Sequence, residues 1–214
     1  AKLIGLHRQF AAIWGWSGRQ GFVGCWQVGT DIGSPGDTEG VEVPFYRYQE
    51  LNAENGAVNF LWERLYAIIN SSNQIISSLS ESEDSSEKAE AMFFRAYAYN
   101  MLVTLWGKVP LVIESTTVPK TDYVREEIAK VDELIDNDLS FAITHLPAVG
   151  NARSENRINK DIARQLAGEA YLRLGIREAS YYKKAEDAVS PIIGEGNYRL
   201  IENRYGKFLA DGGD

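Results

Sequence analysis

Five side chains between residues 26 and 48 combine flat aromatic rings with charged groups. Trp and Tyr rings complement the C–H faces of sugar rings, because both surfaces are flat and the aromatic face is electron-rich. Carboxylate and guanidinium groups beside such rings hold hydroxyls through charge-assisted hydrogen bonds. We therefore predict a ligand-binding surface on this stretch. Its residues are Trp26, Asp31, Tyr46, Arg47 and Tyr48.

The segment that carries these side chains, residues 15–57, contains nine glycines and two prolines. Such a density of glycine and proline is typical of loops and turns, and long loops in compact proteins are often functional. A second interpretation stays open, in which the rings only pack the loop onto neighbouring helices.

The sequence gives little support to catalysis or to a resident metal or cofactor. His7 and His145 stand in helical patterns without a catalytic or metal-binding motif, so we expect structural or surface roles and no enzymatic activity. Four acidic residues of the Gly-rich loop have the oxygen ligands that Ca²⁺ prefers, but their spacing matches no calcium-binding loop, so a plain polar loop is the favoured interpretation. They are Asp31, Asp37, Glu39 and Glu42.

Composition limits the partners. The formal net charge is −8 and the isoelectric point about 4.9, so no basic excess exists to neutralise nucleic acid or an anionic membrane surface. No apolar run approaches the ~20 residues that a membrane span needs. The single cysteine, Cys25, has no intrachain partner and is expected to be a small buried hydrophobe.

Beyond residue 57, apolar residues recur at helical spacing. We expect one helix at about 58–79 and a second that starts at the capping pair of Asp84 and Glu87, with its apolar stripe running from Met92 to Leu105. A third helix is expected from Thr121–Asp122 to just before Pro147, with Val124 on its apolar face and Asp136 and Asp138 on a solvated face. Two more are expected at about 158–174 and 179–193, and residues 1–20 have a weaker helical pattern. Helices paired through short loops predict an all-α, tetratricopeptide-like solenoid of helical hairpins.

Five segments in order resemble motifs of the SusD/RagB-type outer-membrane lipoproteins, which bind nutrients. Residues 59–76 resemble a helix motif with Trp62, Tyr66, Ile69 and Asn73, and residues 89–112 resemble the family's signature segment, with Arg95, Tyr99, Gly107 and Pro110. Residues 136–147, 157–175 and 181–200 resemble the following helix ends and helices. The resemblance covers about residues 58–205.

The resemblance implies a tetratricopeptide-like scaffold without enzymatic activity. It implies capture of an oligosaccharide or another nutrient for a SusC-like TonB-dependent transporter, at the outer membrane on the cell surface. Attachment would be through an N-terminal lipid anchor upstream of residue 1. An alternative is a tetratricopeptide-like scaffold for protein–protein interaction with no small-molecule ligand of its own.

The resemblance also implies how the chain is organised. Residues 1–214 are expected to be one SusD-like N-terminal helical domain, with a loop-rich insertion at 15–57 and helical repeats at 58–205. The C-terminal half of the family has no counterpart in this sequence. Residues 91–112 are expected to be scaffold rather than ligand surface, with Arg95 paired to Glu90 or Glu63.

Overall fold

The computed structural model describes residues 2–14, 25–34, 40–79, 85–116, 118, 120–151 and 157–198. These residues are helical apart from turns and extended connections, which confirms the all-α prediction, and one isolated bridge is the only β pairing among them. They divide into two compact units, residues 1–147 and 148–214. That both units belong to one domain stays a prediction.

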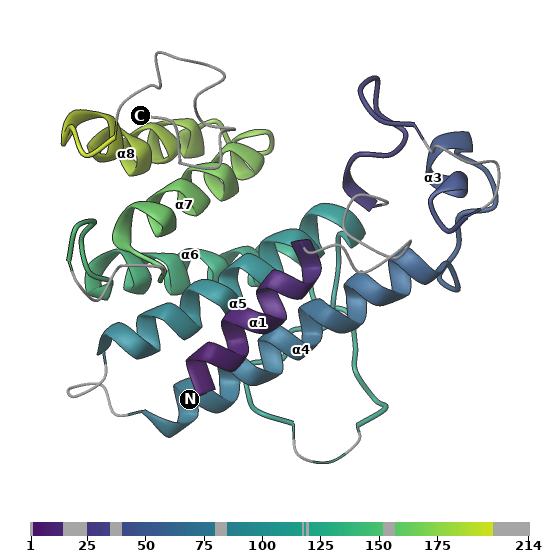
Figure 1. Ribbon diagram of the computed structural model, residues 1–214, viewed down its shortest axis with the longest axis horizontal. Helices are drawn as coiled ribbons and strands as arrows, with labels where there is room; N and C mark the ends of the chain where they lie inside the picture. The colour runs from purple at the N-terminus through teal and green to yellow at the C-terminus, as the bar shows by residue number, and fades with distance from the viewer. Residues whose placement is uncertain are drawn as a thin grey trace, which may run out of the picture. The chain divides into compact units, whose positions relative to one another are not determined.

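The first unit is built around a long helix, α5 (Ser85–Trp106). This helix packs against α4 (Gly56–Ser78) and α6 (Ile128–His145), and α1 (Lys2–Trp14) lies against both α4 and α5 (Figure 1). Because α5 has neighbours on several sides, most of its residues are buried, including Phe94 and Tyr99 at 0% exposure. Both helices predicted for this region are confirmed, and α5 begins at Ser85, which agrees with the start expected from the capping pair of Asp84 and Glu87. The proposed cap Asp84 lies outside the described residues.

The predicted start of the third helix at Thr121–Asp122 is wrong. Helix α6 begins at Ile128, and the chain before it is extended: Arg125 forms an antiparallel bridge with Pro110, and the Glu126 backbone N–H donates to the Val109 carbonyl at 2.9 Å. Val124 is 76% exposed rather than on an apolar helix face. The backbone pairing with the 109–110 segment satisfies polar groups that a longer helix would have bonded internally.

Side chains of α4 and α5 hold the extended segment that follows Gly107. Tyr99 donates its hydroxyl to the Val112 carbonyl at 3.0 Å and accepts from the Val112 N–H at 2.7 Å. The Asn73 amide donates to the carbonyls of Val112 and Glu114 at 3.0 and 3.1 Å. These motif residues therefore replace the strand partner that this segment lacks, which supports their assignment as scaffold.

The sequence predicted that Arg95 pairs with Glu90 or Glu63, and this prediction is wrong. Its guanidinium donates two hydrogen bonds to the Asp138 carboxylate, at 2.7 and 2.8 Å, and a third to the Asn73 side-chain oxygen at 2.8 Å. Asp138 is 1% exposed, so its predicted place on a solvated face is also wrong. Glu90 is buried too, and its carboxylate hydrogen-bonds to His7 of α1, which fits the expected structural role of that histidine.

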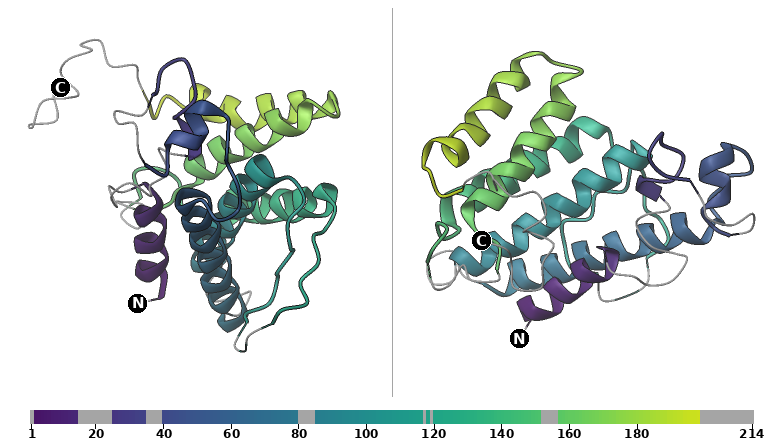
Figure 2. Two further views of the ribbon diagram at one scale, coloured as in Figure 1. Left: turned by 90° about the vertical axis from the view of Figure 1, so that its right-hand side faces the viewer. Right: turned by 45° about the horizontal axis from the view of Figure 1, so that its top comes forward.

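The second unit is a helical hairpin of α7 (Lys160–Gly175) and α8 (Ser180–Gly194), close to the two helices predicted there (Figure 2). The Asn159 side chain caps α7 by accepting from the N–H groups of Asp161 and Ile162. Gly168 allows the helices to approach closely, since a Cβ atom there would lie 2.5 Å from the Val189 side chain.

Candidate functional site

The aromatic side chains predicted to bind ligand stand on two segments, residues 25–34 and 40–50, that pack against each other. The Tyr48 hydroxyl donates to the Gly29 carbonyl oxygen and so ties the two segments together. Gly29 adopts φ +90°, and a Cβ atom on it would lie 2.6 Å from the Phe45 carbonyl oxygen. Glycine is therefore required there both for the backbone conformation and for the close approach. We call residues 25–34 and 40–50 the aromatic loops.

Asn55 fastens the aromatic loops to the scaffold. Its side-chain NH₂ donates to the Val41 carbonyl at 2.7 Å, while its side-chain oxygen accepts from the N–H groups of Ala57 and Val58 and so caps α4. Figure 1 shows the short helix α3 (Val43–Arg47) beyond the N-terminal end of α4. One side chain thus fixes both the start of α4 and the position of the loops.

The five predicted site residues all lie at the surface of the aromatic loops. Trp26 is 41% exposed, Tyr46 is 50% exposed and Tyr48 is 77% exposed, and Asp31 and Arg47 are exposed as well. Neither Asp31 nor Arg47 forms an ion pair with another described residue. The structure joins Tyr48 to the 25–34 segment through the Gly29 carbonyl. The role of the five side chains as ligand residues stays a prediction.

The other chemical candidates of the loop segment give weaker signals. Among the described residues no group of three His, Cys, Asp or Glu side chains could hold a metal ion, and two of the acidic residues considered for Ca²⁺, Asp37 and Glu39, lie outside those residues. Cys25 is partly buried, and burial raises the pKa of its thiol to about 11. A thiol with such a pKa is a poor nucleophile at neutral pH, because the thiolate is the reactive form.

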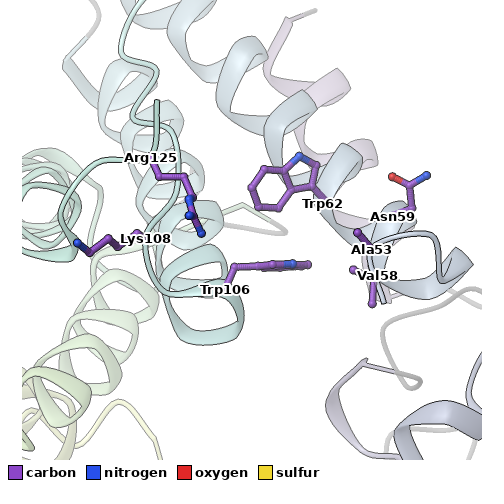
Figure 3. A pocket seen from close by; sticks show the side chains of 7 residues that line it. All are labelled: Ala53, Val58, Asn59, Trp62, Trp106, Lys108 and Arg125. Carbon is purple, nitrogen blue, oxygen red and sulfur yellow. The ribbon is translucent and has the colours of Figure 1, made fainter. Parts of the chain in front are cut away.

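A pocket that the sequence did not suggest opens beside the aromatic loops, with a volume of about 330 Å³. Its walls include Trp62 of α4 and Trp106 of α5, whose rings meet edge to face with centroids 5.3 Å apart and planes at 73°. Figure 3 shows the Arg125 guanidinium reaching toward the space beside the two indoles, whereas the Lys108 ammonium extends away from it. We call this site the tryptophan pocket. Sequence periodicity assigned Trp62 to the helix scaffold and left Arg125 unremarked.

A larger cavity of about 760 Å³ continues along α4 from Trp62, between this helix and the 110–123 segment. Two of its polar side chains bind the backbone of the extended segment: the Tyr66 hydroxyl donates to the Pro110 carbonyl at 2.8 Å, and the Asn70 side-chain oxygen accepts from the Thr116 N–H at 2.8 Å. Burial raises the pKa of the Tyr66 phenol far above its ordinary value, so this hydroxyl stays protonated and keeps its hydrogen bond. Tyr66 and Asn70 thus help to position the extended segment along α4.

Comparison with known proteins shows what this architecture is similar to. A family described as SusD-like, "Starch-binding associating with outer membrane", matches residues 38–172. A SusD-like protein P2 of Formosa agariphila is 29% identical over 70% of this chain and 30% of its own length. Two solved structures share the fold. A SusD homolog from Bacteroides thetaiotaomicron has a TM-score of 0.77 at 20% identity, and a laminarin-binding SusD-like protein has a TM-score of 0.78 at 21% identity. Each match covers 97% of this chain, with 42% of the first protein and 47% of the second.

The chain spans about a third of the length of the curated relatives it matches. None of its described helices is long and apolar enough to cross a membrane. The family description is that of a carbohydrate-binding, outer-membrane-associated class rather than of an enzyme, which confirms the predicted non-catalytic class. Because the family match extends over more than half of the sequence, the chain belongs to the SusD-like family.

Proposed function

We propose that this chain forms part of a glycan-binding protein, and that the exposed rings of the aromatic loops are its contact surface for oligosaccharide. The observation that carries this proposal is the exposure of Trp26, Tyr46 and Tyr48, from 41% to 77%, on loops that hydrogen bonds hold in place. Large rings that face solvent on a fixed backbone provide contact area at a small entropic cost on binding.

The charged members of the surface complement the rings. Asp31 accepts hydrogen bonds and Arg47 donates them, and neither is occupied by an ion pair within the described part of the chain. Both side chains therefore keep their hydrogen-bonding capacity for sugar hydroxyls. The laminarin-binding relative supports a glucan as the first ligand to test.

The proposal extends to the physiological role. In the whole protein, capture would precede delivery to a SusC-like TonB-dependent transporter at the outer membrane, with a lipid anchor N-terminal to residue 1 keeping the protein on the cell surface. Purification of the full-length protein from native membranes tests this part. Recovery together with a TonB-dependent barrel supports it, and recovery without any barrel under mild detergent argues against it.

Isothermal titration calorimetry of the chain with malto- and laminari-oligosaccharides tests the binding surface. Replacement of Trp26 or Tyr46 by Ala is expected to weaken binding by about 2- to 10-fold each, because a stacked aromatic contact contributes about 0.5–1.5 kcal/mol beyond its buried area. Trp14→Ala is the matched control, since Trp14 is 50% exposed in the same unit but lies on α1. Equal losses in all three variants would contradict the assignment.

A further inference from the structure

The tryptophan pocket has a charge distribution that the aromatic loops lack. The antiparallel bridge between Pro110 and Arg125 places these two residues opposite each other. Side chains of directly opposite residues project from the same face of a paired segment, and alternate residues share that face. Lys108 and Glu127 therefore belong to the same face as Arg125, which agrees with the ion pair that joins them.

Arg125 supplies a positive charge that no described side chain neutralises. The face carries two cations, Lys108 and Arg125, and one anion, Glu127, which leaves one positive charge in excess. The neighbouring Glu126 pairs with Lys130 at 2.8 Å. The guanidinium of Arg125 makes no hydrogen bond or ion pair with the described residues. An excess cation at a pocket favours an anionic group on the ligand.

The walls of the pocket favour a ring beside that anionic group. Trp62 and Trp106 are each only partly buried, and their edge-to-face contact leaves ring surface toward the cavity (Figure 3). The volume of about 330 Å³ is at the lower end of the range for small-molecule sites, roughly 300–1,000 Å³. A single sugar residue with its substituents fits a site of this size better than a long chain does.

A second polar side chain of the pocket, that of Asn59, is also available to a ligand. Asn59 lines the pocket, and its side-chain amide makes no hydrogen bond within the described part of the chain. In the larger cavity, by comparison, the side chains of Tyr66 and Asn70 are bound to backbone groups. Asn59 and Arg125 thus supply an amide and a guanidinium for an incoming ligand.

From this arrangement we infer that the tryptophan pocket is a second carbohydrate subsite, separate from the aromatic loops, that takes a sugar residue bearing an oxyanion. The sugar ring packs on Trp62 or Trp106, and its carboxylate or sulfate group accepts two parallel hydrogen bonds from the Arg125 guanidinium. A carboxylate would come from a uronic acid and a sulfate from a sulfated sugar. The inference concerns only anionic sugars, so it is independent of whether the aromatic loops bind neutral glucans.

Calorimetry with three disaccharides tests the subsite: a diuronate, a sulfated disaccharide and a neutral disaccharide. The chain is expected to bind at least one anionic disaccharide at least about fivefold more tightly than the neutral one. Raising the salt from about 0.05 M to about 0.5 M is expected to remove most of this preference, because the pocket is open to solvent. Whichever anionic disaccharide binds more tightly identifies the source of the oxyanion.

Three variants make the result specific. Arg125→Gln is expected to abolish the preference for the anionic sugar, whereas Arg64→Gln, which removes an exposed arginine of α4 outside the pocket, is expected to keep it. Trp26→Ala is expected to keep the preference for the anionic sugar even where it weakens binding at the aromatic loops, so failure of the aromatic loops and failure of this subsite are distinguishable. Both glutamine substitutions are at exposed side chains, and circular dichroism checks that each variant is folded. Equal affinity for neutral and anionic disaccharides, or an unchanged preference in Arg125→Gln, would overturn the inference.

Discussion

Replacing Asp138 by Ala is expected to destabilise residues 1–147 by about 3–5 kcal/mol. The reason is that Asp138 is 1% exposed and accepts two of the three hydrogen bonds that the buried Arg95 guanidinium donates. Without the carboxylate, a positive charge remains in the core with only the neutral oxygen of Asn73 as a partner. An uncompensated buried charge costs far more than the cavity left by a small side chain.

The double variant Arg95→Met with Asp138→Leu separates the charge from the loss of packing. It removes both charges, so the remaining penalty is the unpaired Asn73 oxygen, which costs about 1–3 kcal/mol. The double variant is therefore expected to be more stable than Asp138→Ala by about 2 kcal/mol. The Asn73 amide keeps its hydrogen bonds to the 112–114 backbone, so the local fold is preserved.

Urea unfolding followed by tryptophan fluorescence measures the stability of residues 1–147, the part of the chain that contains Asp138. All five tryptophans, the last of which is Trp106, precede residue 148, so their emission reports on residues 1–147 and not on the α7–α8 hairpin. A loss below about 1 kcal/mol in Asp138→Ala would mean that the Arg95 charge is not stranded in the core. A double variant less stable than the single variant would also contradict the prediction, since the buried charge would then not be the dominant cost.

Three further outcomes are expected. Gly107→Ala should lower the free energy of unfolding by about 1 kcal/mol, because Gly107 adopts φ +72°, which an alanine adopts only with strain. The cost is one of backbone strain alone, since the nearest atom to an added Cβ, in the Ile128 side chain, lies 3.9 Å away. A urea midpoint of tryptophan fluorescence equal to that of the wild type would contradict this prediction. Gly168→Val should destabilise the α7–α8 hairpin by about 1–3 kcal/mol through its clash with the Val189 side chain; thermal unfolding by circular dichroism should show it, and an unchanged melting profile would count against it. Iodoacetamide should alkylate Cys25 about tenfold faster per pH unit up to pH ~10, because burial raises the pKa of the thiol to about 11 and only the thiolate reacts; a rate that levels off near pH 9, as for an unfolded chain, would show that the thiol is not buried.

The helices could be predicted because their apolar residues follow the 3.6-residue period, as on α4, where Leu61, Leu65 and Ile69 are all buried. The start of α6 could not be predicted in this way. Val124 continues the apolar spacing, but the next residue, Arg125, pairs with Pro110 in an extended segment. Such pairing depends on residues about fifteen positions away, which local periodicity does not report.

The partner of Arg95 was predictable in principle. Asp138 lies on the same helical stripe as Val131, Ile135 and Ala142, all of which are buried. A charged residue on an apolar stripe indicates a buried partner of opposite charge, and Arg95 lies on the buried α5 helix in the same way. The two partners expected from the sequence, Glu90 and Glu63, both precede Arg95 in the chain, and Glu90 hydrogen-bonds to His7 instead.

One part of the candidate site could be predicted from the sequence and the other part could not. Exposure of the loop aromatics could be anticipated from a Gly-rich segment with Trp and Tyr, because such a segment has little helical periodicity to bury them. The tryptophan pocket could not be predicted from the sequence. It forms only because the packing of α4 on α5 and the bridge between Pro110 and Arg125 bring Trp62, Trp106 and Arg125 together.

A crystal structure of the chain soaked with a laminari-oligosaccharide would show directly whether the aromatic loops bind glycan. We expect a sugar ring stacked on Trp26, Tyr46 or Tyr48, with its hydroxyls within hydrogen-bond distance of Asp31 or Arg47. The neutral sugar bound elsewhere, with the rings of the aromatic loops bare, would contradict the assignment of these loops as the glycan-binding surface.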